Sequence, residues 1–129
     1  MQLPFIAPIA AAALALAGAA HAAGVQIGLA APLDGATALL GAQMRDGARV
    51  AAREAGAELV TADDRCSAEG GEAAARTLAE ARVAVVVGFL CTEAIEAALP
   101  VLTRAGIPTV TPGVRADGLT DRRTRTGWL

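Results

Sequence analysis

The chain has 129 residues, enough for one domain, and its 11 basic side chains face 13 acidic ones, for a formal net charge of −2. This balance excludes the overall basic surface that binding to nucleic acid or to an anionic membrane requires. Every basic residue is arginine and the single histidine is His21, so the chain beyond this residue lacks the His and Lys side chains that most often serve as general bases and nucleophilic amines.

The first 22 residues are an uncharged apolar stretch that ends in Ala20-His21-Ala22, a small-residue cleavage pattern. We interpret residues 1–22 as a secretory signal peptide and residues 23–129 as the exported domain. The usual positive n-region is missing, because no Arg or Lys precedes Arg45. A membrane anchor is the weaker alternative, since Pro4 and Pro8 interrupt the stretch.

Apolar runs alternate with segments of helical period along the remainder of the chain. Strands are expected at residues 25–31, 57–63, 83–88 and 107–111, and helices at about 38–55, 70–81 and 92–104. The run at 83–88 (VAVVVG) is apolar throughout, which is typical of a strand buried on both faces. In the first helix, one face can be shared by Leu40, Gly47, Ala48, Ala51 and Ala55, while Arg45, Arg49 and Arg53 fall on another.

This alternation predicts an α/β fold, a Rossmann-like parallel sheet with right-handed crossovers and helices on both faces. All loops that lead from a strand to a helix then emerge at one edge of the sheet, where ligands usually bind. Cys66 follows the second strand and Cys91 the third. If the first strand lies between these two, the cysteines can form a disulfide, as the export signal favours. Such a bridge would contribute about 3–4 kcal/mol to the free energy of unfolding.

Other kinds of site fit these residues poorly. Cys91 as a nucleophile has no histidine partner, and two cysteines without C-x-x-C spacing do not make a zinc site. Asp63 and Asp64 close the second strand, where an acidic residue can hold a ribose, but the chain lacks the G-x-G-x-x-G fingerprint. We interpret the two aspartates as caps of the sheet edge, one of them serving the next helix. No cofactor or metal is expected.

Thr92 stands at the predicted start of the third helix, and two roles compete for its hydroxyl. The hydroxyl can cap the helix, or it can bind an anion such as a carboxylate together with the free N–H groups of the first turn. Its position alone favours capping.

Several segments, in order, resemble a known family, the periplasmic leucine/isoleucine/valine-binding proteins of ABC transporters. The resemblance implies a two-lobed, non-enzymatic receptor in the periplasm, which closes over a branched-chain amino acid or a similar small carboxylate or amide. It then passes the ligand to a membrane permease. Only an incomplete amino-terminal lobe is recognisable, with the second lobe absent. The matching segments are IGLAAPLDGATALLGAQMRDGARVAAREAG, ADDRCSAEGGEAAARTL and VAVVVGFLCTEAIEAALPVLTRAGIPTVTPGVRADGLT.

The family's binding residues fall on four positions of this chain. The resemblance implies that Thr92 holds the ligand's α-carboxylate, with further contacts at Gly113 and Arg115. Leu40 stands where the family often has an aromatic ring, and Arg115 where a small hydroxylic residue is usual. Cys66 and Cys91 have the spacing of the family's disulfide.

Two alternatives remain open at this point. A single lobe cannot enclose a ligand, so the chain is alternatively a truncated remnant that binds nothing. A nucleotide-binding or enzymatic module on the same sheet is less favoured, because the His, Lys and glycine fingerprint are absent. An incomplete lobe should also leave apolar surface or a strand edge exposed.

Overall fold

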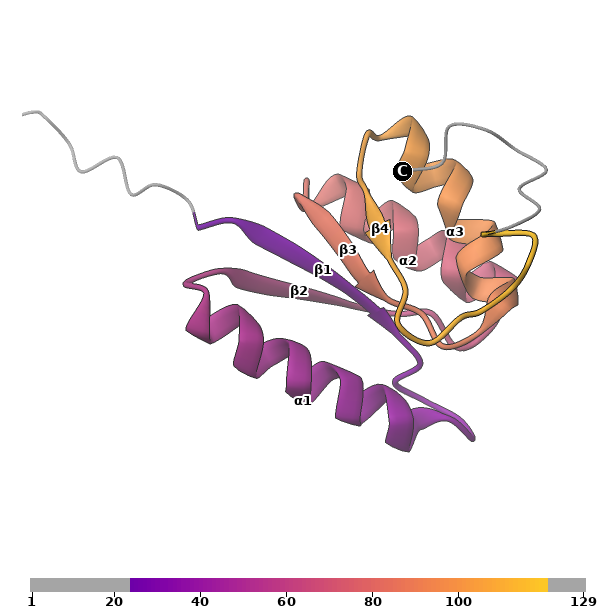
Figure 1. Cartoon of the computed structure of the whole chain (residues 1–129), viewed down its shortest axis with the longest axis horizontal. Helices are drawn as coiled ribbons and strands as arrows, with labels where there is room; N and C mark the ends of the chain where they lie inside the picture. Colours follow the sequence, from indigo (N-terminus) through magenta and orange to yellow (C-terminus); the bar gives the residue numbers. More distant parts are fainter. Residues whose placement is uncertain (1–23, 121–129) are drawn as a thin grey trace, which may run out of the picture.

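The computed structural model describes residues 24–120, which form four strands and three helices in alternation (Figure 1). Each element lies within a few residues of the position that the sequence predicts. In chain order they are β1 (Gln26–Ala31), α1 (Ala38–Glu54), β2 (Glu58–Asp63), α2 (Ala68–Glu80), β3 (Val85–Gly88), α3 (Thr92–Arg104) and β4 (Thr109–Val110).

All four strands pair in parallel, in the order β2-β1-β3-β4. Ile27 on the central strand β1 pairs with Leu59 on one side and with Val85 on the other. The predicted α/β fold is confirmed, and β1 separates the two strands that precede the cysteines. The carboxyl ends of all four strands meet at one edge of the sheet, which we call the carboxyl edge.

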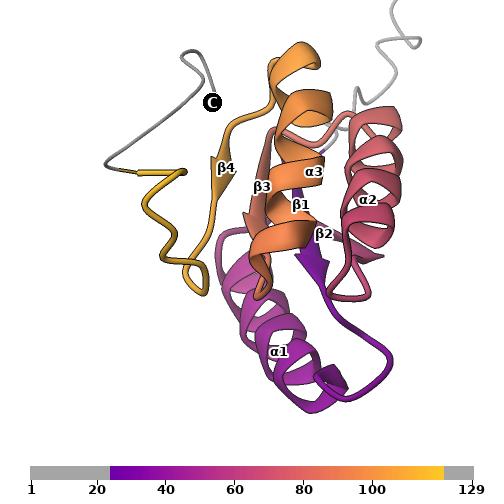
Figure 2. The same cartoon turned by 90° about the vertical axis from the view of Figure 1, so that its right-hand side faces the viewer.

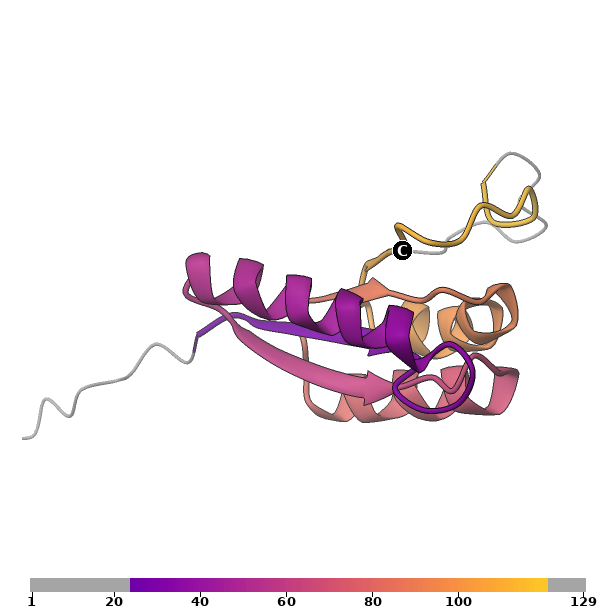
Figure 3. The same ribbon diagram turned by 90° about the horizontal axis from the view of Figure 1, so that it is seen from below.

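Helices cover both faces of the sheet. Helix α1 lies over β1 and β2 on one face, and α2 and α3 pack side by side on the other (Figures 2 and 3). The close packing of these two helices requires Gly71, because a Cβ there would overlap the backbone of Ala94. The main core lies between this helix pair and the sheet. Its largest fully buried apolar side chains are Phe89, Leu78, Leu102 and Val86.

The face of α1 that these small and apolar residues share is not the face that packs on the sheet. Leu40, Gly47, Ala51 and Ala55 are exposed, and the buried positions of the helix are Gly41 and Ala52. Gly41 is buried because α1 passes so close to Pro32 that a Cβ on Gly41 would overlap the Pro32 carbonyl. Only a narrow strip of α1 therefore touches the sheet. Because many residues of α1 are small or apolar, the hydrophobic period of the sequence does not identify this strip.

The third strand is not buried on both faces as predicted. Val86 is fully buried under α2 and α3, whereas Val85 and Val87 are partly exposed on the α1 side. Helix α1 lies over β1 and β2 and leaves this part of the sheet open.

At the sheet edge, β4 has two residues, and Val110 is 57% exposed. Within residues 24–120, no helix combines the length and the apolar character needed to cross a membrane.

Candidate functional site at the carboxyl edge

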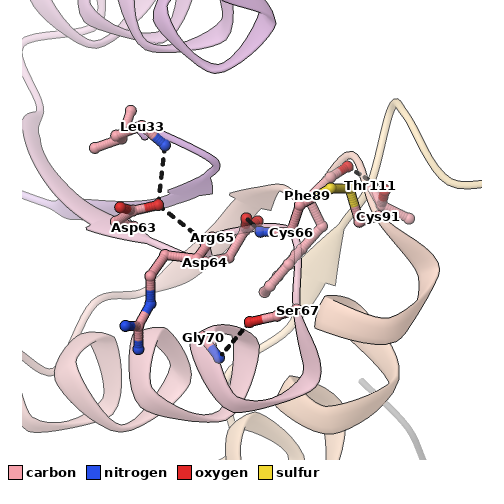
Figure 4. The surroundings of a disulfide bond; sticks show 10 residues. All are labelled: Leu33, Asp63, Asp64, Arg65, Cys66, Ser67, Gly70, Phe89, Cys91 and Thr111. Carbon is pink, nitrogen blue, oxygen red and sulfur yellow. Dashed lines mark hydrogen bonds between the residues drawn. A yellow bond between two sulfur atoms is a disulfide. The ribbon is translucent and has the colours of Figure 1, made fainter. Parts of the chain in front are cut away.

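A disulfide joins two loops at the carboxyl edge. Cys66 in the β2–α2 loop bonds to Cys91 in the β3–α3 loop, with the two Cα atoms 5.2 Å apart (Figure 4). The bridge passes the end of β1, because β1 lies between β2 and β3. The predicted Cys66–Cys91 pairing is thus confirmed, and neither cysteine remains as a free thiol.

The β2–α2 loop is held by the two aspartates at the end of β2. Arg65 and Cys66 have positive φ angles of 46° and 52°, a region that residues other than glycine rarely occupy. Asp63 Oδ1 accepts a hydrogen bond from the backbone N–H of Arg65, and Asp64 Oδ1 accepts one from that of Cys66, both at 2.9 Å. Each carboxylate therefore stabilises one residue of the left-handed turn that directs Cys66 toward Cys91.

Neither aspartate caps the next helix, so that part of the interpretation is wrong. Ser67 is the N-cap of α2, and its hydroxyl accepts a hydrogen bond from the Gly70 N–H at 3.0 Å. Helix α2 consequently begins at Ala68, two residues before the predicted start. The aspartates bond the backbone of the loop instead, because the chain turns immediately after β2.

Asp64 is a buried carboxyl group in this loop. It has no exposed surface, and its second oxygen, Oδ2, has no hydrogen-bond partner in the part of the chain that the structure describes. Burial raises the pKa of Asp64, the hydrogen bond from Cys66 opposes this rise, and the nearby Asp63 adds to it. The low-dielectric surroundings thus favour the neutral form of this group.

The loops after β3 and β4 are joined through Thr111. Its hydroxyl donates to the Phe89 carbonyl at 3.2 Å and accepts from the Val114 N–H at 3.1 Å. Gly113 in the same turn packs on the β3–α3 loop, since a Cβ there would lie 2.8 Å from Leu90 Cδ2. The predicted site residue Gly113 is therefore next to the loop that leads into Thr92. Thr111 was not among the residues predicted from the sequence; the available signal was a hydroxyl between a short strand and a Pro-Gly turn.

Thr92 is the first residue of α3 rather than its cap. The N-cap is Cys91, without a side-chain cap bond, and the first intrahelical hydrogen bond runs from the Ile95 N–H to the Cys91 carbonyl at 3.3 Å. The capping role that position favoured for Thr92 is therefore wrong. Its side chain is partly buried, and no residue among 24–120 hydrogen-bonds its hydroxyl. The hydroxyl and the N–H groups of the first turn remain available together.

The other two predicted site residues, Leu40 and Arg115, lie on other elements than Thr92 and have different neighbours. Leu40 lies in the first turn of α1, on the opposite face of the sheet from α3, and is 52% exposed. Arg115 is exposed and lines a hollow of about 440 Å³ with Val114, Asp117 and Thr120. Thr92 is not among the described residues of that hollow. Across residues 24–120, no group of three or more His, Cys, Asp or Glu side chains is placed to hold a metal ion.

Sequence comparison places this architecture among known proteins. A model of the family described as periplasmic binding protein matches residues 24–128. An amino acid binding protein of Pseudomonas aeruginosa PAO1 is 36% identical over 110 residues, which cover 78% of this chain but 29% of that protein.

Several solved structures of similar fold contain bound ligands. The branched-chain amino acid transporter substrate-binding protein LivJ of Streptococcus pneumoniae, in complex with isoleucine, is 26% identical with a TM-score of 0.71; the match covers 78% of this chain and 32% of that one. A solute-binding protein of an ABC transporter from Rhodopseudomonas palustris BisB5, in complex with 3,4-dihydroxybenzoic acid, is also 26% identical, with a TM-score of 0.67 and coverages of 75% and 29%. This chain thus spans about a third or less of the length of these relatives. The chain belongs to the periplasmic binding protein family.

Proposed function

We propose that this chain is the substrate-binding component of an ABC transporter, or its amino-terminal lobe, and that it binds a small carboxylate at the carboxyl edge. A branched-chain amino acid is the first candidate ligand. The chain would act in the periplasm after removal of residues 1–22 and would deliver its ligand to a membrane permease. It would need no cofactor and would catalyse no reaction. Membership of the family and the resemblance of the sequence segments support this proposal.

The observation that carries the proposal is the free hydroxyl of Thr92 in the first turn of α3. The positive end of a helix dipole and its free N–H groups favour a bound anion, and a hydroxyl beside them adds a donor. The ligands named for the two solved structures, isoleucine and 3,4-dihydroxybenzoic acid, share a carboxylate although their other parts differ. A site that recognises chiefly a carboxylate accounts for this common feature.

The remaining predicted residues would shape the site around that carboxylate. Gly113 would let the β4 turn approach the ligand next to Leu90, and Leu40 would offer an apolar contact from the α1 side. Arg115 would add a cationic contact, which favours a ligand with a second anionic group. A single lobe leaves the ligand open to water, so we expect affinity only in the millimolar range, about 4 kcal/mol of binding free energy.

Nuclear magnetic resonance detects binding of this strength. A ¹⁵N-labelled sample of the folded chain would be titrated with leucine, isoleucine, valine and benzoate, with leucinol as the control that lacks the carboxylate. We expect saturable shifts of the Thr92, Glu93 and Ala94 amides with the carboxylates and none with leucinol. Thr92→Ala should weaken binding about tenfold, as expected for a lost hydrogen bond to a charged group. Thr77→Ala on the exposed face of α2 is the matched control and should change nothing.

The two alternative functions predict different results in the same titration. A folded wild-type chain that gives no shifts with any carboxylate would support a remnant without binding activity. Saturable shifts with ATP or NAD, at the loops after β1 and β2, would support a nucleotide-binding module instead.

A further inference from the structure

We infer that Asp63 is a positioning residue of the proposed binding site, which fixes the two sides of the carboxyl edge relative to each other. The inference rests on the proposed function, because it assigns Asp63 an effect on ligand affinity. Asp63 itself lies at the end of β2 and need not touch the ligand. Its role follows from the two backbone groups that share its carboxylate.

A single oxygen of Asp63 bonds two different loops. Oδ1 accepts from the N–H of Leu33 in the β1–α1 loop and from the N–H of Arg65 in the β2–α2 loop, each at 2.9 Å (Figure 4). A carboxylate makes stronger hydrogen bonds to N–H groups than a neutral acceptor does. The side chain is partly buried, and Leu33 lies thirty residues away in sequence. The shared oxygen therefore joins segments that are distant along the chain.

Each of these loops leads to one side of the proposed site. On the α1 side, Leu33 follows Pro32, against whose carbonyl Gly41 packs tightly, and Gly41 adjoins Leu40. The position of Leu33 thus sets where the first turns of α1 lie. On the α3 side, Arg65 precedes Cys66, whose disulfide holds Cys91 directly before Thr92. Displacing the Arg65 backbone would therefore move the start of α3.

No other side chain within residues 24–120 hydrogen-bonds the β1–α1 loop to a second loop. Asp64 bonds only its own turn, through Cys66, and Asp34 bonds only the adjacent Gly35 N–H at 2.7 Å. The disulfide joins the loops after β2 and β3 but leaves the one after β1 free. Loss of the Asp63 carboxylate should accordingly release the β1–α1 loop while the disulfide and the sheet persist.

Three variants of the full chain test this inference. Asp63→Ala removes the acceptor for both N–H groups, whereas Asp63→Asn keeps one neutral acceptor oxygen in its place. Asp34→Asn serves as the control. It changes a carboxylate of the β1–α1 loop that accepts a hydrogen bond only from the adjacent Gly35 N–H. Amide hydrogen exchange at Leu33 and Arg65 reports directly on the two hydrogen bonds that Asp63 accepts, and titration with leucine reports on the binding site.

The expected result is an ordered series. In Asp63→Ala, the Leu33 and Arg65 amides should exchange about tenfold faster or more, and the affinity for leucine should fall by a similar factor. Asp63→Asn should recover most of both losses, and Asp34→Asn should match the wild type. Amides in the centre of β1 should keep their wild-type exchange rates in all three variants, which separates loop release from general unfolding.

Two outcomes would overturn the inference. Unchanged exchange at Leu33 in Asp63→Ala would mean that Asp63 does not hold the loop. Faster exchange with unchanged leucine affinity would mean that the two hydrogen bonds of Asp63 are structural and do not position the site. A wild-type chain that binds no leucine would refute the proposed function and, with it, the effect of Asp63 on binding, while the exchange data would still decide whether Asp63 holds the loops.

Discussion

Asp64 combines three features that are unfavourable for a charged side chain. It is fully buried, one of its oxygens has no partner within residues 24–120, and the carboxylate of Asp63 is adjacent in sequence. Its single hydrogen bond, from the Cys66 N–H, only partly offsets the loss of hydration. These features explain why the pKa of Asp64 lies above its ordinary value. The group should therefore make folding stability depend on pH.

The sign of this dependence follows from proton linkage. Because the folded pKa of Asp64 is raised, the folded chain binds this proton more tightly than the unfolded chain does. The contribution is fully present below the ordinary pKa of 3.8 and is lost as the pH rises through the raised value. Every tenfold change in proton affinity corresponds to about 1.4 kcal/mol.

We therefore predict that the wild type loses stability relative to Asp64→Asn as the pH rises from about 4 to 7. Urea unfolding of both proteins at several pH values in this range measures the difference. Other titrating groups affect the stability of both proteins alike, so their effects cancel in the difference between the two. A stability change that does not depend on pH shifts this difference by the same amount at every pH. A difference that does not vary with pH would contradict the prediction.

At the scale of elements, glycines decide how closely the helices pack. Gly71 in α2 faces the backbone of Ala94 in α3 with no room for a side chain, and this contact sets the spacing of the helix pair. Gly47 in α1 has nothing within 4 Å of where a Cβ would lie. Both glycines are inside helices, where alanine is preferred by about 1 kcal/mol if space allows.

The same substitution at these two positions should thus have opposite effects. Gly71→Ala should lower the free energy of unfolding by about 1–3 kcal/mol, because the added methyl group forces the helices apart. Gly47→Ala should raise it by about 0.5–1 kcal/mol. Chemical denaturation of both variants provides the test. Destabilisation by Gly47→Ala, or none by Gly71→Ala, would show that the helices do not pack as described.

At the scale of the whole molecule, one covalent link connects the two halves of the sheet at the carboxyl edge. The disulfide spans 25 residues and ties the loop of the edge strand β2 to that of the inner strand β3. In contrast, the opposite side of the sheet has a two-residue strand with an exposed valine. The stability of the fold should depend strongly on the link, because alanine is the commonest of the buried hydrophobic residues and buries little apolar surface.

Replacing both cysteines by serine should lower the free energy of unfolding by about 3.5 kcal/mol, from the loop entropy that the bridge removes in the unfolded chain. This is a large part of the roughly 5–15 kcal/mol typical of a domain. Urea unfolding of the oxidised wild type and of the Cys66→Ser/Cys91→Ser variant measures the loss. A loss below about 1 kcal/mol would mean that the unfolded chain gains little freedom without the bridge.

The sequence by itself determined the order of the strands and helices along the chain and the edge at which the cysteines meet. Strand and helix periods are local properties, and a β-branched run such as 83–88 reports its own conformation. Parallel connection then brings Cys66 and Cys91 to one edge, since every crossover returns the chain to the same side. The position of Thr92 at a predicted helix start made it a candidate, and the family resemblance implied that it binds a carboxylate. The structure then showed that no residue among 24–120 hydrogen-bonds its hydroxyl.

Only the tertiary structure decided which surfaces touch. The buried strip of α1 depends on the approach of Gly41 to Pro32, and local periodicity cannot choose it in a helix rich in small residues. The hydrogen bond between Asp63 and Leu33 joins residues thirty positions apart. Ser67, and not an aspartate, is the N-cap of α2, because the left-handed turn after β2 sets where the helix starts. The approach of Gly41 to Pro32 and the bond from Asp63 to Leu33 depend on how the chain folds back on itself, which the local sequence pattern does not determine.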